Sequence, residues 1–304
     1  MSEKFSSFDR MVGVSKEEEE YLQKKARERF EDQSFEELEG KEQPKTPEEG
    51  RIIKLANSLT DRIREKYGLE GFDIPRDNIH VIDSKQWVGR MKTGGLYSPS
   101  KQAIYIRDDL AYMVFSRSLT HELLHFKSYN ALQKRIGEEK FSIYRMGLIT
   151  ESRKDETFYF DKLTEAVTEE LAKKYISEIW TDPVFEDELK ETKRLKEKYP
   201  EYDDEDMYWL GEFEGENGEK IIKHEVSAYK EERKDLLLGI EELFKENSDR
   251  FQSKEEVWDI FVKAMLDGKL ISLGKLIDRT FGKGSFRKIG EGGKFSDIIE
   301  NKKE

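Results

Sequence analysis

The stretch SLTHELLHF, residues 118–126, constrains this chain more than any other part of its sequence. It places two of the four histidines, His121 and His125, four residues apart, with Glu122 directly after the first. On an α-helix, residues four apart stand on the same face about one turn apart. The two rings can then reach one metal ion, and Glu122 is placed to accept a proton rather than to bind the metal. The pattern predicts a helix with two zinc ligands and a general base; the alternative is a solvated helix with two incidental histidines.

Composition narrows the kinds of site and partner that this chain can have. The chain contains no cysteine, so a metal ion would be held by histidine, aspartate and glutamate side chains. Its formal net charge of −12 argues against non-specific nucleic-acid binding, which needs a basic surface. No stretch reaches the roughly 18 apolar residues of a membrane helix, and the start, MSEKFSSFDR, has no apolar signal-peptide core. We therefore expect a cytoplasmic protein without a membrane or nucleic-acid partner; its oligomeric state stays open.

The chain begins with a charged segment and then changes to patterned sequence. Residues 1–50 are poor in apolar side chains, which is typical of a flexible segment or a solvated helix. From Ile52 to Tyr67 apolar residues recur at helical spacing, and this pattern predicts a helix that ends near Gly68. The segments NIHVID and GGLYSPSKQAIYIRDD, which follow, predict short strands.

The rest of the chain alternates between helical and extended patterns. We expect a long helix from Leu110 to Lys134 that contains HELLH, followed by paired strands in FSIYRMGLIT and ETFYF. Apolar residues at helical spacing predict a second helix over residues 163–175. Residues 183–220 have no clear pattern, residues 224–280 predict helices throughout, and the Gly- and Lys-rich tail predicts loose order.

A catalytic zinc site needs three protein ligands and one open position, so HELLH alone is incomplete. The pattern H-E-x-x-H-x-x-G-x-x-H does not complete it, because Ser128 stands in the glycine position and no histidine follows. The better candidate is the predicted helix LTEAVTEEL. There, Glu165 follows His125 by 40 residues, and Glu169 lies one turn further on the same face. Helical glutamates are most often solvated, and the conjunction with HELLH is what singles out Glu165.

HELLH followed by TEAVTE resembles the gluzincin metallopeptidases, in particular the compact members called minigluzincins. These enzymes pair H-E-x-x-H with a downstream helix of the type N-E-x-x-x-[DE], and Thr164 stands here where that pattern has asparagine. The resemblance implies that His121, His125 and Glu165 bind one Zn²⁺ ion. It also implies that Glu169 orients a liganding histidine by a hydrogen bond.

Together with the patterns above, the resemblance, which covers roughly residues 78–180, implies an α+β fold in three parts. Residues 1–50 would be the charged segment. Residues 51–182 would form a zincin-like catalytic region with a small mixed sheet, the active-site helix and the glutamate helix. Residues 183–304 would form a mainly helical subdomain with a flexible tail. The AIYI strand, residues 103–106, would be the edge of the sheet next to the site.

The expected activity is that of a zinc-dependent metallopeptidase, which hydrolyses a peptide or protein substrate. Glu122 would take a proton from a zinc-bound water, whose pKa the metal lowers toward about 7, and deliver it to the leaving amine. The charge that develops on the substrate needs a donor, and the available candidates are His224 and Tyr229, with Arg233 and Arg145 behind them. The alternative is a zincin-like protein that binds metal without cleaving peptides. Glu122 argues against it, because a structural zinc site needs no base.

Overall fold

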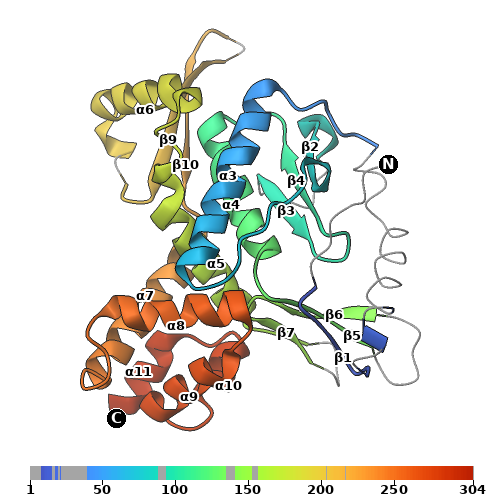
Figure 1. Cartoon of the computed structure of the whole chain (residues 1–304). Helices are drawn as coiled ribbons and strands as arrows, with labels where there is room; N and C mark the ends of the chain where they lie inside the picture. Colours follow the sequence, from blue (N-terminus) through green and yellow to red (C-terminus); the bar gives the residue numbers. More distant parts are fainter. Residues whose placement is uncertain are drawn as a thin grey trace.

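A computed structural model of the chain describes residues 8–15, 18–19, 21, 40–87, 94–134, 141–152, 157–202, 204–215 and 217–303. Helices and small sheets are mixed along these residues, so the chain is an α+β protein, as the sequence predicts. Two sheets and a two-stranded hairpin lie around central helices, and the C-terminal helices gather at one end of the molecule (Figure 1).

The smaller sheet forms from the segments that the sequence marks as strands. Its order is β2 (Ile79–Ile82), β4 (Ala103–Arg107) and β3 (Gly95–Ser98), with β2 parallel and β3 antiparallel to β4. The sheet is therefore mixed, as expected. The AIYI segment lies in β4, which pairs on both sides, so its expected edge position is wrong. The edge strands are β2 and β3, and β3 is the one that lies beside Glu122.

A second sheet joins distant parts of the chain. Its order is β1 (Arg10–Val12), β5 (Asn130–Lys134), β6 (Phe141–Met146), β7 (Ile149–Glu151) and β8 (Phe158–Tyr159). β1 runs parallel to β5, and Phe8 and Met11 are buried, so part of the segment expected to be flexible or a solvated helix is packed. Most of its other residues lie outside the described ranges. The expected strand FSIYRMGLIT is a hairpin, because Gly147, with φ 58°, turns the chain between β6 and β7.

HELLH lies on α4 (Tyr112–Phe126), which is shorter than the predicted helix over residues 110–134. The helix ends early because side chains that follow it satisfy carbonyl groups of its last turn. Ser128 Oγ and Asn130 Nδ2 donate to two of these carbonyls at 2.7 and 3.0 Å. The apolar residues beyond this point fit a helix in sequence, but they pair with β1 and β6 as a strand.

Two predicted helices contact α4. α3 (Pro47–Lys66) starts at a capping box between Thr46 and Glu49, and the chain leaves it through Gly68, whose φ of 77° favours glycine. α5 (Asp161–Tyr175) carries the glutamates of LTEAVTEEL. These contacts bring the glutamate helix beside the HELLH helix, although the four strands from β5 to β8 separate the two in sequence.

A helix and a hairpin occupy the region that the sequence leaves unassigned. α6 (Glu186–Lys198) packs on β9 (Met207–Glu214), and β9 pairs antiparallel with β10 (Lys220–Val226). The expectation of a helix from residue 224 is wrong at its start, because KIIKHEV forms its hydrogen bonds with β9. Helical structure resumes at α7 (Lys230–Glu246).

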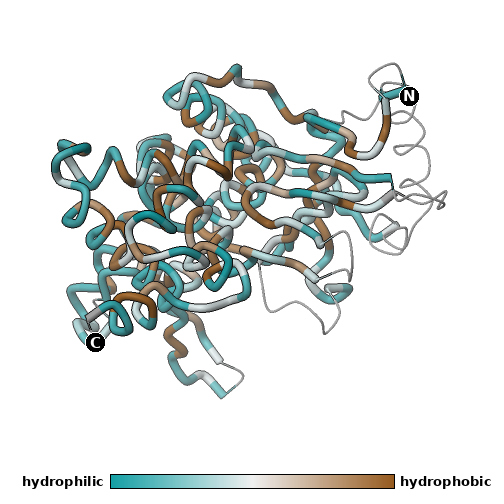
Figure 2. The backbone as a smooth tube through the Cα atoms, turned by 90° about the horizontal axis from the view of Figure 1, so that it is seen from below, coloured by the Kyte–Doolittle hydropathy of each residue, from teal (hydrophilic) through white to brown (hydrophobic). Residues whose placement is uncertain are grey.

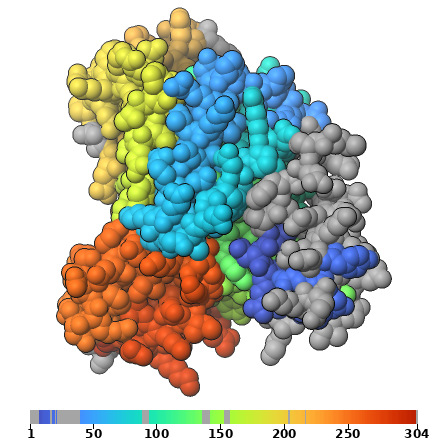
Figure 3. Space-filling view, viewed as in Figure 1, coloured from blue at the N-terminus to red at the C-terminus, as the bar shows by residue number. Residues whose placement is uncertain are grey.

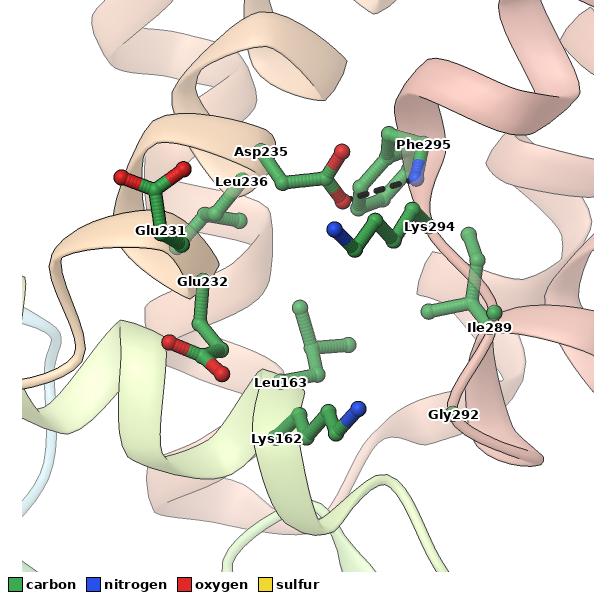
Figure 4. A pocket seen from close by; sticks show the side chains of 11 residues that line it. Lys162, Leu163, Glu231, Glu232, Asp235, Leu236, Ile289, Gly292, Lys294 and Phe295 are labelled. Atoms are coloured by element: carbon green, nitrogen blue, oxygen red, sulfur yellow. Dashed lines mark hydrogen bonds between the residues drawn. The ribbon is translucent and has the colours of Figure 1, made fainter.

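The C-terminal tail is ordered, so the expectation of a loose tail is wrong. Four helices follow α7: α8 (Lys254–Asp267), α9 (Leu270–Phe281), α10 (Ser285–Gly290) and α11 (Phe295–Lys303). Asp235 of α7 accepts hydrogen bonds from the backbone N–H groups of Phe295 and Ser296 at 2.8 and 3.0 Å, which caps α11. Figure 4 shows Asp235 reaching the start of α11 beside a small pocket. The Phe295 ring is fully buried and fixes the tail to the core.

Two large groups of buried apolar side chains hold these elements together. One lies among α3, α4 and the three-stranded sheet, and the other joins α5 to α7, α8, α9 and α11. Figure 2 shows apolar stretches alternating with hydrophilic ones along the tube, and the projecting hairpin tip is hydrophilic. In Figure 3 the C-terminal helices adjoin α3 and the segment after it, and Leu59 and Ile63 of α3 belong to the second group. Single 3₁₀ turns occur at Arg76–Asn78, Ser84–Gln86, Ile176–Glu178, Pro183–Phe185 and Pro200–Tyr202.

None of the helices in the described ranges combines the length and the apolar character that crossing a membrane requires.

Candidate metal centre

Three potential ligand atoms meet where α4 and α5 face each other. Nε2 of His121 and Nε2 of His125 lie 3.0 Å apart. Oε2 of Glu165 lies 3.2 Å from the His121 nitrogen and 3.4 Å from the His125 nitrogen. All three side chains are mostly buried. The two helices thus assemble a group that could hold a metal ion from residues 40 positions apart.

The geometry and chemistry of these atoms fit zinc. Ligand atoms about 2.1 Å from a tetrahedral zinc ion lie about 3.4 Å from one another, close to the separations of 3.0 to 3.4 Å in this cluster. Nitrogen and carboxylate oxygen are also the donor types of catalytic zinc sites with two histidines and one glutamate. His121 Nδ1 lies 2.8 Å from Glu169 Oε2, a partner that keeps the proton on Nδ1 and leaves Nε2 free to bind a metal.

The electrostatics of the cluster favour positive charge at its centre. Burial lowers the pKa of His121, but hydrogen bonds to Glu165 and Glu169 outweigh burial and hold this pKa well above its ordinary value. Burial raises the pKa of Glu165, but the His125 charge and the hydrogen bonds to both histidines outweigh it and lower this pKa strongly. Each group therefore stabilises the charged form of the other, and a bound cation would take the place of the proton.

Glu169 is the most heavily hydrogen-bonded carboxylate near the cluster. Its Oε2 accepts from His121, and its Oε1 accepts from Arg117 Nη2 at 2.7 Å and from the backbone N–H of Ala228 at 3.0 Å. Burial raises the pKa of Glu169, but the bond to His121 and the Arg117 charge outweigh it and lower this pKa to about 2. The carboxylate is thus ionised and fixed, which suits the orienting role that the resemblance implies.

Glu122 lies beside the cluster at the wall of a cleft. Burial raises its pKa, and the charges of His121 and His125 partly oppose this shift. The strand β3 comes so close that a Cβ at Gly95 would lie 3.1 Å from Cγ of Glu122 and 2.6 Å from Cδ1 of Ile106. Glycine at this position therefore leaves room for the Glu122 side chain.

The cleft has a volume of about 230 Å³ and opens between α4, β3 and the hairpin. Its wall includes His121, Glu122 and Tyr229. The Tyr229 ring stacks on the His121 ring with centroids 6.1 Å apart. Burial, the Glu165 charge and a hydrogen bond to Glu165 raise the pKa of Tyr229, so its hydroxyl keeps its proton. The other lining residues are Gly94, Gly95, Arg107, Leu110, Val114, Arg117, Ser118, Glu169, Tyr208, Glu225, Val226 and Ala228.

Three of the expected donors do not line this cleft. His224 is exposed on β10, where its ring packs against Tyr202 with centroids 5.0 Å apart. Arg233 is buried and pairs with Asp206 and Glu170 behind the cleft. Arg145 donates to backbone carbonyl groups in another part of the molecule. Of the four candidates, only Tyr229 is near the cluster, because the turn after β10 brings it there.

Thr164, which stands where the gluzincin pattern has asparagine, is fully buried. Its Oγ1 donates to the carbonyl of Phe160 at 2.8 Å, in the first turn of α5. Phe160 has a left-handed backbone with φ 66° and supplies no side-chain cap. The same carbonyl also accepts the Thr164 N–H at 2.9 Å, so the threonine hydroxyl satisfies itself on the backbone and does not cap the free N–H groups of the glutamate helix.

The structure adds two residues that sequence reasoning missed. Glu188 of α6 accepts hydrogen bonds from the backbone N–H groups of Tyr112 and Met113 at 2.7 and 2.8 Å and so caps α4, which has no cap of its own. No local signal in the sequence links these positions. Arg117 could have been found, because it lies four residues before His121 and thus on the same helical face.

No family model matches the chain, and neither does any curated protein or solved structure. The fold and the cluster define a mixed α+β protein with a candidate metal centre.

Proposed function

We propose that this chain is a zinc-dependent metallopeptidase of gluzincin type. The observation that carries the proposal is the meeting of Nε2 of His121, Nε2 of His125 and Oε2 of Glu165 within 3.4 Å of one another. Glu122 at the wall of the adjoining cleft supports an enzyme, because it adds a base that a purely structural metal site does not need.

Zinc held by His121, His125 and Glu165 would supply Lewis acidity, which activates a water molecule and polarises the scissile carbonyl. Glu122 would accept the proton of the attacking water on its carboxylate and deliver it to the leaving amine. Its raised pKa suits this second step, because a carboxylate of low basicity holds a proton too weakly to carry it.

Tyr229 is the group that would stabilise the negative charge that develops on the substrate oxygen. Its ring lies against His121 at the cleft wall, and its raised pKa keeps the hydroxyl available as a donor. Removal of a comparable donor costs about 100- to 1000-fold in kcat in related sites. We expect a Tyr229→Phe variant to lose activity through kcat, with little change in KM.

Zinc content and peptide cleavage together test the proposal. The wild-type protein and a Glu122→Gln variant are reconstituted with zinc, freed of excess metal and analysed for bound zinc. Both are then incubated with a mixed peptide library. A Glu178→Gln variant is the matched control, because Glu178 is an exposed glutamate whose partner is Arg62 on the surface. We expect one zinc ion per chain in all three proteins and loss of cleavage in the Glu122 variant alone.

Three other outcomes would reject the proposal. Protein without stoichiometric zinc would rule out a zinc site in this cluster. Stoichiometric zinc with equal cleavage by wild type and the Glu122 variant would reject the peptidase. Zinc without cleavage by either would favour a zincin-like protein that uses the metal for binding or structure.

A further inference from the structure

Arg117 connects the candidate metal centre to the segment that carries Tyr229. It lies on α4 one turn before His121, and its side chain is 4% exposed. Its Nη2 donates to Oε1 of Glu169 at 2.7 Å, to the backbone carbonyl of Glu169 at 3.1 Å and to Oγ of Ser227 at 3.2 Å. One guanidinium nitrogen therefore joins α4 to α5 and to the turn after β10.

The Glu169 carboxylate also binds the turn after β10. Its Oε1 also accepts the backbone N–H of Ala228 at 3.0 Å, while its Oε2 holds His121. Ser227 and Ala228 are thus fixed immediately before Tyr229. The orientation of a liganding histidine and the path of this turn depend on one hydrogen-bonded group.

The backbone of Tyr229 needs such support. Its φ of 51° and ψ of 39° lie in the left-handed region, which is unfavourable for a residue other than glycine. A residue stays in that region only where its surroundings impose it. The contacts of Ser227 and Ala228 with Arg117 and Glu169 provide part of this constraint and keep the Tyr229 ring against His121.

Stability alone does not explain a buried arginine at this position. Nε and Nη1 of Arg117 are buried and have no hydrogen-bond partner among the described residues. Burying a charge costs several kcal/mol, and an ion pair offsets this cost only when its remaining donors are also satisfied. The donors of Arg117 are only partly satisfied, so its geometry is the better reason for its presence.

We propose that Arg117 is a positioning residue that sets two parts of the site together: His121 through Glu169, and Tyr229 through Ser227. This inference rests on the proposed metallopeptidase function. Arg117 touches neither the ligand atoms nor the reacting groups in this scheme, and it acts through the residues that do.

An Arg117→Lys variant tests the proposal, because lysine keeps the charge but its ammonium ends one bond short of the position of Nη2, the nitrogen that holds Glu169 and Ser227. We expect zinc affinity, measured by competition with a chelator, to fall about 10- to 100-fold, as for other residues that orient metal ligands. We expect kcat to fall by up to about 100-fold, with KM within about threefold. Arg145→Lys is the matched control, because Arg145 is also buried and bonded to backbone carbonyls but lies outside the cleft. It should change the unfolding temperature alone.

A Ser227→Ala variant separates the effect of Arg117 on Tyr229 from its effect on His121. It leaves the Arg117–Glu169 pair in place, so the fold and the zinc affinity should stay as in wild type while kcat falls. Combining Arg117→Lys with Tyr229→Phe then tests the coupling: the effect of the lysine on kcat should shrink once the hydroxyl is absent.

Unchanged zinc affinity in Arg117→Lys, or an undiminished effect of the lysine in the Tyr229→Phe background, would overturn the proposal. So would a Ser227→Ala variant with wild-type kcat. A wild-type protein that binds zinc but cleaves no peptide would instead reject the proposed function. Zinc affinity would then decide whether Arg117 positions His121.

Discussion

Replacing Glu169 by glutamine should weaken zinc binding through a proton on the wrong nitrogen of His121. Both carboxylate oxygens accept: Oε2 from His121 Nδ1, and Oε1 from Arg117 and Ala228. Glutamine has one acceptor oxygen and an NH₂ group that only donates. If its oxygen serves Arg117 and Ala228, its NH₂ faces Nδ1 of His121. The histidine then carries its proton on Nε2, the atom that must bind the metal.

The expected loss of zinc affinity follows from the role of Glu169 in orienting His121. Loss of a group that orients a liganding histidine typically costs 10- to 100-fold in metal affinity, or about 1.4–2.7 kcal/mol. We expect Glu169→Gln to lie at the upper end, because the variant opposes the required tautomer in addition to losing a hydrogen bond. Titration of the metal-free protein with zinc in the presence of a competing chelator measures the change directly.

Glu170→Gln is the matched control for this variant. Glu170 is the next residue on α5, and its partner is Arg233, outside the cluster. Its zinc affinity should equal that of wild type. If Glu169→Gln also binds zinc within about threefold of wild type, the tautomer argument is refuted, and the contact between Glu169 and His121 has no role in metal binding.

Four further predictions follow from the same structure. Gly95→Ala should lower kcat about tenfold, because the new Cβ would push on Glu122; an unchanged kcat would show that the cleft adapts. Phe295→Ala should reduce the free energy of unfolding by about 3–5 kcal/mol in urea denaturation, and a loss below about 1 kcal/mol would contradict the packing of the tail. Zinc at 100 times its Kd should stabilise the wild-type protein by about 2.7 kcal/mol, an effect that chelator should remove. Burial raises the pKa of Asp206, but hydrogen bonds from its two cationic partners outweigh burial and lower this pKa. The ion pairs of Asp206 therefore stabilise the folded protein fully above the ordinary pKa of 3.8, and this stabilisation is lost as the pH falls below that value. Asp206→Asn should accordingly destabilise the protein more at pH 7 than at pH 3; an equal loss would refute the ion pairing.

The elements that could be predicted are those whose signal is local. The apolar spacing from Ile52 to Tyr67 marks α3, β-branched segments mark β2 and β4, and the Ser-Pro-Ser turn marks β3 as the partner of β4. The spacing of His121 and His125 puts both rings on one helical face whatever surrounds them. That Glu165 lies beside them could be anticipated from its order and distance after HELLH and from the resemblance, since nothing local in its helix separates it from the other glutamates.

The elements that could not be predicted depend on partners far away in the sequence. β5 is a strand because β1 and β6 pair with it, and residues of β1 lie about 120 positions earlier. β10 is a strand because of β9. His224 has the right residue type for a donor, but the register of that hairpin turns it toward Tyr202. Tyr229 reaches the cluster through a left-handed turn for which the sequence gives no signal.

The pairing of β1 with β5 affects how the N-terminal segment can be studied. The Asp9 N–H donates to the Asn130 carbonyl there, and the Asn130 N–H donates to the Asp9 carboxylate. The Asn130 side chain also donates to a carbonyl in the last turn of the HELLH helix. A deletion of the first 40 residues would uncover the edge of β5, and exposed strand edges recruit other chains and aggregate. It would also loosen the end of the helix that holds both histidines. A loss of zinc binding after such trimming would therefore report damage to the fold around the candidate metal centre, so shortened versions for cloning or crystallisation should begin before Phe8.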